Sequence, residues 1–435
     1  MPRHQPQAKY LMVKTPHRTK LASLPANTFQ LDNGLTIVHQ EINATPVVAT
    51  DVWIRAGANA EPESWSGMAH FLEHMIFKGS HQVGVGEFDL AVENTGGMTN
   101  AATSHDYAHF YLTTANTHLA QTLPYLADIL LQATIPDAEF IREREVVLEE
   151  IRSSHDDPDW VGFQTLYQTV YQAHPYRRSI LGEVDLLMQH TPDLMRCFHR
   201  TYYQPENMTV VIVGGIDRES ALELVEQNFN KFSVRSECPP VTVDAEPPMI
   251  GIRRQELVLP RIEQARLMMA WLAPSASNLR EGVGLDILAA VLTGGLCSRL
   301  VRELREEKQL VLDITSSFSL QQDSSLFSVA ALLDSQDLDL VEQLICDHIQ
   351  ELAIKPISEA ELARAQRMLI NDYIFSTETP TQLASIYGYY NTIDCLEQCL
   401  AYPQLVADYS ASELQRLARM YLSPQRYASV ILKPS

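Results

Sequence analysis

Long apolar runs are missing from the sequence, and no stretch reaches the length of a membrane-spanning helix. The N-terminal residues also lack the apolar core of a secretory signal peptide. Cysteine is scarce, and its spacing does not resemble a disulfide framework, which favours a reducing compartment. The six cysteines are Cys197, Cys238, Cys297, Cys346, Cys395 and Cys399. We therefore predict a protein with no membrane-bound part, in the cytoplasm or, as the alternative, in an organelle matrix or stroma.

Positive charge is also in short supply. The 435 residues include 33 Lys and Arg against 54 Asp and Glu, for a net charge of −21. This balance argues against nucleic acid as a partner, because nucleic acid selects basic faces. It suits a cavity that receives basic peptides, although such charge also serves solubility. A hydrophobic content of 46% is ordinary for a globular chain of one to three domains, and two domains are favoured.

The few basic residues are dense at the N-terminus, where no acidic residue precedes Asp32. This composition predicts that residues 1–27 form a flexible basic arm. The basic residues of this arm include Arg3, Lys9, Lys14, Arg18 and Lys20.

The strongest chemical signal lies in residues 68–77, which read MAHFLEHMIF. His70, Glu73 and His74 stand in the order H-x-x-E-H, so on a helix all three share one face. Two imidazoles one turn apart can hold a zinc ion, and the carboxylate between them can act as a general base. Ser64, Ser66 and Gly67 precede the segment with residue types that cap helices. A chance cluster on a solvated helix is the competing interpretation, so the motif needs a third ligand and a matching fold.

The chain reads as two similar halves. Residues 29–40 predict a hairpin, and residues 46–56, 98–113 and 209–214 predict further strands around helices at 88–94, 119–133 and 139–152. After a proline-rich stretch, strands are predicted at 265–272, 311–318, 326–333 and 428–432, with helices at 282–292, 338–352 and 359–374. Short matches recur at an offset of 219 to 222 residues, such as residues 135–139 with 357–361. In the second half, Leu292, Gly295 and Leu296 replace the H-x-x-E-H residues.

We therefore predict an α+β fold of two duplicated domains, each a mainly antiparallel sheet flanked by helices. Residues 28–237 form the catalytic domain, 238–250 a proline-rich linker, and 251–435 the non-catalytic domain.

The predicted helix 139–152 supplies candidates for a third ligand. Glu143 and Glu150 are two turns apart on one face, so one can reach a metal ion while the other supports it. Glu149, the neighbour of Glu150, is the alternative ligand. A surface helix with interspersed arginines would have a similar composition.

Together these features resemble the pitrilysin or insulinase-type zinc peptidases, and within them the branch of the mitochondrial processing peptidase β subunit and its bacterial relatives. The resemblance runs from about residue 28 to the C-terminus. It rests on HFLEH and, after 75 intervening residues, on Glu150 within EVVLEEI. Further matching stretches are Gly96-Gly97-x-x-Asn100-Ala101, His174-Pro175, Ile180-Leu181-Gly182, Ser298-Arg299-Leu300 and Glu303-Leu304-Arg305.

The resemblance implies a role for each matching residue. His70, His74 and Glu150 would bind one zinc ion per chain. Glu73 would be the general base on a zinc-bound water, and Glu143 a supporting carboxylate of the catalytic site. Asn100 and Ala101 would lie on an edge strand that pairs with an extended peptide.

One departure concerns the second half. Related subunits that complete the peptidase carry an arginine there and a tyrosine seven residues later. This chain has Arg305, but Leu312 stands at the tyrosine position and Gln309 replaces a glycine. The resemblance therefore implies a heterodimer with a homologous partner that carries the Arg–Tyr pair, and a homodimer is the alternative.

The sequence thus predicts a zinc-dependent endopeptidase of the processing-protease type, which hydrolyses extended or unfolded peptides in an enclosed chamber. The alternatives are a non-catalytic structural subunit of a larger complex and a peptide-binding module that holds zinc without turnover.

Overall fold

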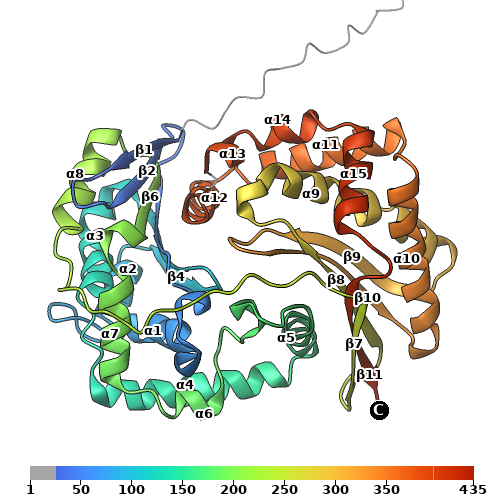
Figure 1. Ribbon diagram of the computed structural model, residues 1–435. Coiled ribbons are helices and arrows are strands. Elements are labelled where there is room, and N and C mark those ends of the chain that lie inside the picture. Colours follow the sequence, from blue (N-terminus) through green and yellow to red (C-terminus); the bar gives the residue numbers. More distant parts are fainter. Residues whose placement is uncertain (1–25, 395) are drawn as a thin grey trace, which may run out of the picture.

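The computed structural model describes residues 26–394 and 396–435, which form two α+β units side by side (Figure 1). The predicted basic arm, residues 1–27, lies almost entirely outside the described residues. Within the described ranges, no helix combines the length and apolar character needed to cross a membrane.

The first unit is built on a sheet with the strand order β1-β2-β6-β3-β5-β4. Its strands are β1 (Asn27–Gln30), β2 (Thr36–Glu41), β3 (Val47–Ile54), β4 (Met98–Thr103), β5 (Ala108–Ala115) and β6 (Met208–Gly214). Strand β6 reads MTVVIVG and is buried throughout, as expected of β-branched residues in a central strand. Strands β1 and β2 form the predicted hairpin, in which Gly34 adopts a φ of 97° that favours glycine. Strand β4 lies at the edge of the sheet.

The helices of the first half of the chain carry most of the polar residues discussed below. They are α1 (Met68–Ile76), α2 (Glu87–Glu93), α3 (Asn116–Leu131), α4 (Asp137–His155), α5 (Pro158–Val170), α6 (Val184–Leu187), α7 (Pro192–Tyr202) and α8 (Arg218–Asn228). Short 3-10 turns occur at Ala58–Ala60, Glu63–Trp65, Pro175–Arg177 and Pro205–Asn207. Residues 229–251 contain no helix or strand and lead to the second unit.

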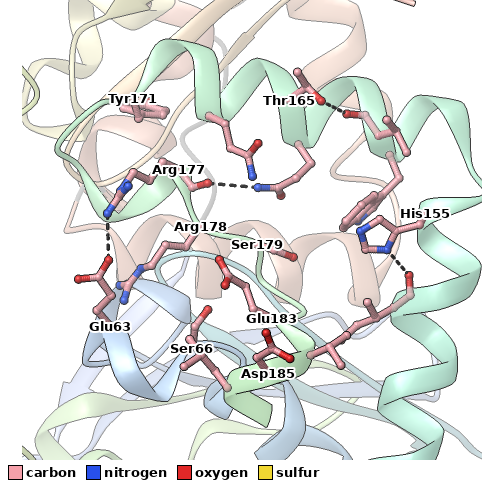
Figure 2. A pocket seen from close by; sticks show the side chains of 18 of the residues that line it. Glu63, Ser66, His155, Thr165, Tyr171, Arg177, Arg178, Ser179, Glu183 and Asp185 are labelled. Carbon is pink, nitrogen blue, oxygen red and sulfur yellow. Dashed lines mark hydrogen bonds and ion pairs between the residues drawn. The ribbon is translucent and has the colours of Figure 1, made fainter. Parts of the chain in front are cut away.

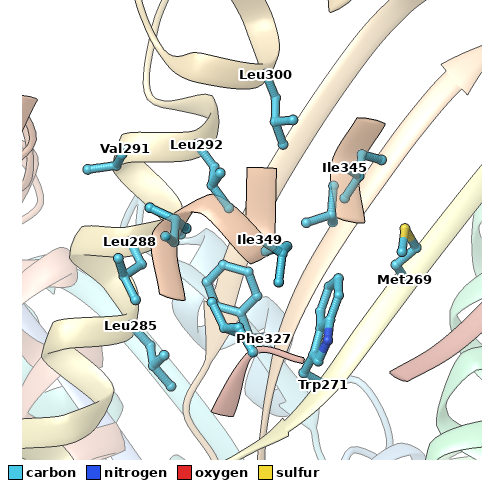
Figure 3. Packing of buried hydrophobic residues seen from close by; sticks show 14 of the residues in the cluster. Met269, Trp271, Leu285, Leu288, Val291, Leu292, Leu300, Phe327, Ile345 and Ile349 are labelled. Atoms are coloured by element: carbon cyan, nitrogen blue, oxygen red, sulfur yellow. The ribbon is translucent and has the colours of Figure 1, made fainter. Parts of the chain in front are cut away.

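The second unit repeats this plan with the strand order β7-β11-β8-β10-β9. Its strands are β7 (Ile252–Leu259), β8 (Ala265–Ala273), β9 (Val311–Ser319), β10 (Ser325–Leu333) and β11 (Tyr427–Pro434). Its helices are α9 (Leu279–Thr293), α10 (Leu338–Ile354), α11 (Glu359–Phe375), α12 (Pro380–Thr392), α13 (Leu396–Leu400), α14 (Tyr402–Ala407) and α15 (Ala411–Tyr421). A π-helical segment spans Val301–Glu307, and 3-10 turns occur at Ala276–Asn278 and Ser335–Asp337. Trp271 and Phe327 pack with Leu288 and Ile349 in its core (Figure 3).

Apart from β1, which has no counterpart among the described strands of the second sheet, the two sheets share one topology. Each contains one parallel pair, β2 with β6 and β7 with β11, and is otherwise antiparallel. The predicted α+β duplication with mainly antiparallel sheets is therefore confirmed.

The two units exchange a helix, which the sequence analysis did not predict. Helix α5 packs Leu166 and Val170 against Met268 and Val430 of the second sheet. Helix α12 in turn packs Leu383, Ala384 and Tyr387 against Val38, Trp53 and Val211 of the first sheet. Pro158 and Pro380, which begin these helices, are 222 residues apart, the same offset as the sequence repeat. Each sheet is therefore covered on one face by a helix of the other half (Figure 1).

Candidate metal centre and its surroundings

Helix α1 carries the H-x-x-E-H residues, and its start is fixed by a buried carboxylate. Both oxygens of Glu61 accept backbone hydrogen bonds, from Gly67 at 2.9 Å and from Ala69 at 2.7 Å. These two N–H groups would otherwise lack a partner at the helix N-terminus. Burial raises the pKa of Glu61 to about 8. The capping expected from Ser64 and Ser66 is wrong, because Glu61 reaches the helix from the preceding turn and takes these bonds instead.

Gly67 allows this helix start to lie close to another segment. Its φ is 86°, and a Cβ atom at this position would lie 2.7 Å from the Leu181 carbonyl oxygen. Both the backbone angle and the close approach require glycine.

The structure brings together His70, His74 and Glu150. The Nε2 atom of His70 lies 3.7 Å from Glu150 Oε1, and that of His74 lies 3.4 Å from Glu150 Oε2. One ligand atom from each residue lies within 4.8 Å of the other two. The rings of Phe71 and Phe140, 4.6 Å apart, pack α1 against α4 and hold the two helices at this spacing.

Glu143 and Lys78 support this cluster from behind. Glu143 Oε1 lies 3.0 Å from His74 Nδ1, and Glu143 Oε2 forms an ion pair with Lys78 at 2.7 Å. A carboxylate that accepts a hydrogen bond from the Nδ1–H group keeps the imidazole proton on Nδ1, and this leaves Nε2 free to bind a metal. Burial lowers the pKa of His70, so its imidazole is neutral at neutral pH. Burial acts the same way on His74, but the hydrogen bonds that its ring donates to the carboxylates of Glu150 and Glu143 raise the pKa of His74.

These residues fit a zinc ion. Two imidazole nitrogens and one carboxylate form the donor set typical of catalytic zinc sites, which keep a fourth position open. Among the described residues, no second group of histidine, cysteine or acidic residues has this geometry. The alternative ligand Glu149 points away, because it forms an ion pair with Arg152 at 2.9 Å on the exposed face of α4.

Glu73 lies beside the cluster and is held by the edge strand. Thr103 Oγ1 of β4 donates a hydrogen bond of 2.6 Å to Glu73 Oε2. Burial raises the pKa of Glu73, while the hydrogen bond from Thr103 acts in the opposite direction. A raised pKa makes a carboxylate a stronger base, which favours proton transfer.

Asn100 and Ala101 lie on the same strand, as the resemblance implied. Strand β4 pairs only with β5 among the described strands, so its other edge presents unpaired backbone groups. Asn100 Oδ1 accepts a hydrogen bond from the backbone N–H of Ala101 at 2.9 Å. One strand therefore carries both an open edge and the residue that holds Glu73.

Arg305 is not brought to this cluster within the chain. It lies in the π-helical segment of the second unit and forms ion pairs with Glu306 at 2.9 Å and Asp313 at 3.7 Å. Leu312 is 58% exposed on β9, the edge strand of the second sheet. Gln309 adopts a φ of 53°, a backbone conformation that favours the glycine it replaces.

A cavity of about 860 Å³ opens beside the C-terminal end of α4 (Figure 2). Arg177 pairs with Glu63 at 3.0 Å, and Arg178 donates to the carbonyl oxygens of Ala58 and Glu61. Glu183 and Asp185 also line the cavity, and neither has an ion-pair partner in the described part of the chain. The remaining lining is mainly polar, with Gln164, Gln168, Gln172, His155, Trp160 and Tyr171.

Three residues around the candidate metal centre were not predicted from the sequence. Lys78 stands four residues after His74, so the helical period could have placed it on the same face. Thr103 and Glu61 carry no such signal, because their contacts depend on how β4 and the turn before α1 fold against the helix.

Comparison with known proteins matches both halves of the chain. The family described as Insulinase (Peptidase family M16) matches residues 36–184. The family described as Peptidase M16 inactive domain matches residues 190–369, the half in which H-x-x-E-H is replaced.

Relatives of similar length are known from several bacteria. The zinc protease PqqE of Helicobacter pylori is 28% identical over 408 residues, which cover 93% of this chain and 92% of that protein. The uncharacterized zinc protease YmxG of Bacillus subtilis is 26% identical over 423 residues, which cover 94% and 98%.

Solved structures share the fold. A protease from Helicobacter pylori superposes with a TM-score of 0.88 at 27% identity, over 95% of this chain and 100% of that one. The periplasmic protease PqqL of Escherichia coli superposes with a TM-score of 0.78 at 20% identity, over 95% of this chain and 48% of that one. A chain about twice as long can therefore contain the same fold.

Proposed function

The chain belongs to the insulinase family, peptidase family M16, and from this premise we propose that it is a zinc-dependent endopeptidase acting on extended or unfolded peptides. The observation that carries the proposal is the meeting of His70, His74 and Glu150 beside Glu73. The relatives named zinc proteases support it. We also propose that, within the family, the chain is most similar to the branch of the mitochondrial processing peptidase β subunit and its bacterial relatives.

In this proposal His70, His74 and Glu150 hold one zinc ion, and Glu143 fixes the tautomer of His74. When bound, zinc supplies Lewis-acid chemistry, which polarises a carbonyl and lowers the pKa of a water molecule. The partial exposure of Glu150 leaves the open side of the site towards solvent, where a substrate can approach.

Glu73 is the proton carrier. It accepts a proton from the attacking water and delivers it to the leaving amine, so the carboxylate is restored at the end of the reaction. Its burial and the hydrogen bond from Thr103 fix one oxygen, Oε2, and leave Oε1 for the proton.

The edge of β4 provides a place for the substrate. An extended peptide that adds to this edge forms main-chain hydrogen bonds whatever its sequence, and a folded domain cannot add in this way. The unpaired carboxylates of Glu183 and Asp185 in the cavity beside α4 favour substrates with basic side chains.

The substrate contacts of the second unit are incomplete, which supports a homologous partner. Leu312 cannot donate a hydrogen bond, and Arg305 is already paired with acidic neighbours. We propose that a partner chain with an Arg–Tyr pair closes over the zinc half to form the chamber. A homodimer that uses Arg305 alone is the alternative.

A non-catalytic subunit is the second candidate function. It is favoured by the match of the second half to the family described as an inactive domain. That match begins at residue 190, after the H-x-x-E-H residues and Glu150, and all of these residues are present in the chain.

Metal analysis together with cleavage of an internally quenched peptide tests the proposal. The wild-type chain should contain about one zinc ion and cleave the peptide in the presence of its partner. Glu73→Gln should keep the zinc and lose turnover, because an amide cannot accept the proton. A zinc-loaded wild-type chain with partner that leaves every peptide intact would favour the non-catalytic subunit.

A further inference from the structure

Two cysteines far apart in the sequence meet on the surface of the first unit. Cys197 lies on α7, and Cys238 lies in the segment between the two units. Their Sγ atoms are 3.7 Å apart, and both residues are half-buried. The sequence spacing of 41 residues gave no sign of this pair. Neither residue takes part in the metal centre.

The backbone around Cys238 is held in register along α7. Gln204 Nε2 donates to the Ser233 carbonyl oxygen at 3.1 Å. Thr201 Oγ1 donates to the Ser236 carbonyl oxygen at 3.0 Å, and the Cys197 thiol lies 3.8 Å from the Glu237 carbonyl oxygen. An ion pair between Arg235 and Glu206 adds a further contact to this stretch. These contacts position Cys238 beside Cys197 without help from a covalent bond.

We propose that Cys197 and Cys238 form a reversible disulfide when the protein meets a peroxide. A disulfide has an S–S distance of about 2.05 Å, so the two sulfur atoms must move closer by rotation of their side chains. The backbone is already in place, and no segment needs to unfold for the bond to form.

The reaction balances with hydrogen peroxide as the oxidant. The Cys197 thiolate attacks one peroxide oxygen, which gives a sulfenic acid and releases hydroxide. The Cys238 thiol then attacks the sulfenic sulfur, and the hydroxyl leaves as water with the Cys238 proton. The proton that Cys197 lost on ionisation neutralises the hydroxide released in the first step. The two thiols are oxidised, the peroxide is reduced to two water molecules, and a dithiol such as dithiothreitol reverses the change.

The surroundings favour this order of events. Burial raises the pKa of the Cys238 thiol to about 12, so at neutral pH it is protonated and is not the sulfur that attacks the peroxide first. Cys346 is buried in the core of the second unit, so it does not compete for Cys197. Cys297 is exposed elsewhere, on the second unit, and serves as a control.

The bond would fasten the start of the connecting segment to α7. It closes a loop that contains the end of α7, β6 and α8, so it restricts the unfolded chain. We expect the oxidised protein to melt several degrees higher than the reduced protein. The residues around Cys238 should also resist proteolysis after oxidation.

Peptide mapping of the full-length folded protein tests this inference. The protein is treated with hydrogen peroxide, the remaining thiols are alkylated, and the digest is analysed by mass spectrometry without reductant. A cross-linked pair of peptides containing Cys197 and Cys238 is expected, and dithiothreitol should remove it. Cys297→Ser should retain the cross-link, and Cys197→Ser and Cys238→Ser should each lose it along with the rise in melting temperature.

Two results would overturn the inference. In the first, peptide mapping finds Cys197 oxidised to the sulfinic acid while Cys238 remains a free thiol. In the second, Cys197 and Cys238 both remain free thiols after peroxide has fully oxidised Cys297. The comparison of oxidised with reduced wild-type protein needs no variant, so it stays decisive if a serine variant folds poorly.

Discussion

Replacing Thr103 with valine should move the pH dependence of peptide cleavage to higher pH. Thr103 donates a hydrogen bond of 2.6 Å to Glu73, and this bond favours the ionised carboxylate. Burial already raises the pKa of Glu73. Valine fills a similar space without the hydroxyl group, so the pKa of Glu73 should rise further.

The size of the shift follows from the strength of this bond. A hydrogen bond to a charged group contributes about 1.5–3 kcal/mol, and one pKa unit corresponds to about 1.4 kcal/mol. The acidic limb of the pH profile should therefore move up by about one to two pH units. The general base must be ionised, so cleavage rises with pH through the pKa of Glu73. At a fixed pH below this limb, the valine variant should be about 10- to 100-fold slower.

The assay is kcat/KM for an internally quenched peptide, measured across pH with the zinc-loaded protein and its partner. This quantity reports the pKa values of groups in the free enzyme. Thr103→Ser is the matched control, because it keeps the hydroxyl and should keep the limb near that of the wild type. A valine variant with the wild-type limb and the wild-type rate would refute the idea that Thr103 holds the base.

Three further outcomes are expected. In metal analysis, Glu150→Gln should lose most of its zinc and Glu149→Gln should keep it. The opposite result would identify Glu149 as the third zinc ligand. Gly388→Ala should destabilise the fold by about 1–3 kcal/mol in calorimetry, because the new methyl group would lie 2.0 Å from Trp53 Nε1. Gly162→Ala should melt near the wild type, because its methyl group would meet only the flexible ends of Met268 and Leu432. The isolated chain should bind zinc yet cleave peptides poorly, and a homologous partner should raise its activity by orders of magnitude; full activity of the chain alone would rule the partner out.

Local sequence patterns predicted most of the fold. The hairpin around Asn33 and Gly34, the buried strand at 208–214 and the helices carrying His70 and Glu150 follow from turn residues and from apolar periodicity. The internal repeat extended these predictions to the second unit. The meeting of His70 with His74 was also predictable, because residues on one helical face have fixed spacings. The choice of Glu150 as the third candidate ligand rested on the family resemblance.

The remaining features depend on contacts between distant segments. Glu61 caps α1 from outside the helix, and Thr103 reaches Glu73 across thirty residues of sequence. The meeting of Cys197 with Cys238 depends on the path of an irregular segment along α7. None of these contacts has a periodic signature, so a single sequence could not reveal them.

The exchange of α5 and α12 bears on what the half without metal ligands contributes. Helix α12 covers one face of the sheet that includes β3 and β6, and without it Val38, Trp53 and Val211 would be exposed to water. The same sheet ends in β4, whose Thr103 holds Glu73. Buried apolar area stabilises a fold by about 25 cal/mol per Å², so loss of this cover would weaken the sheet as a whole. The second unit therefore supports the geometry of a site to which it supplies no metal ligand. In this chain the connecting segment joins two units that complete each other's cores, and the metal-binding half is not an independent module.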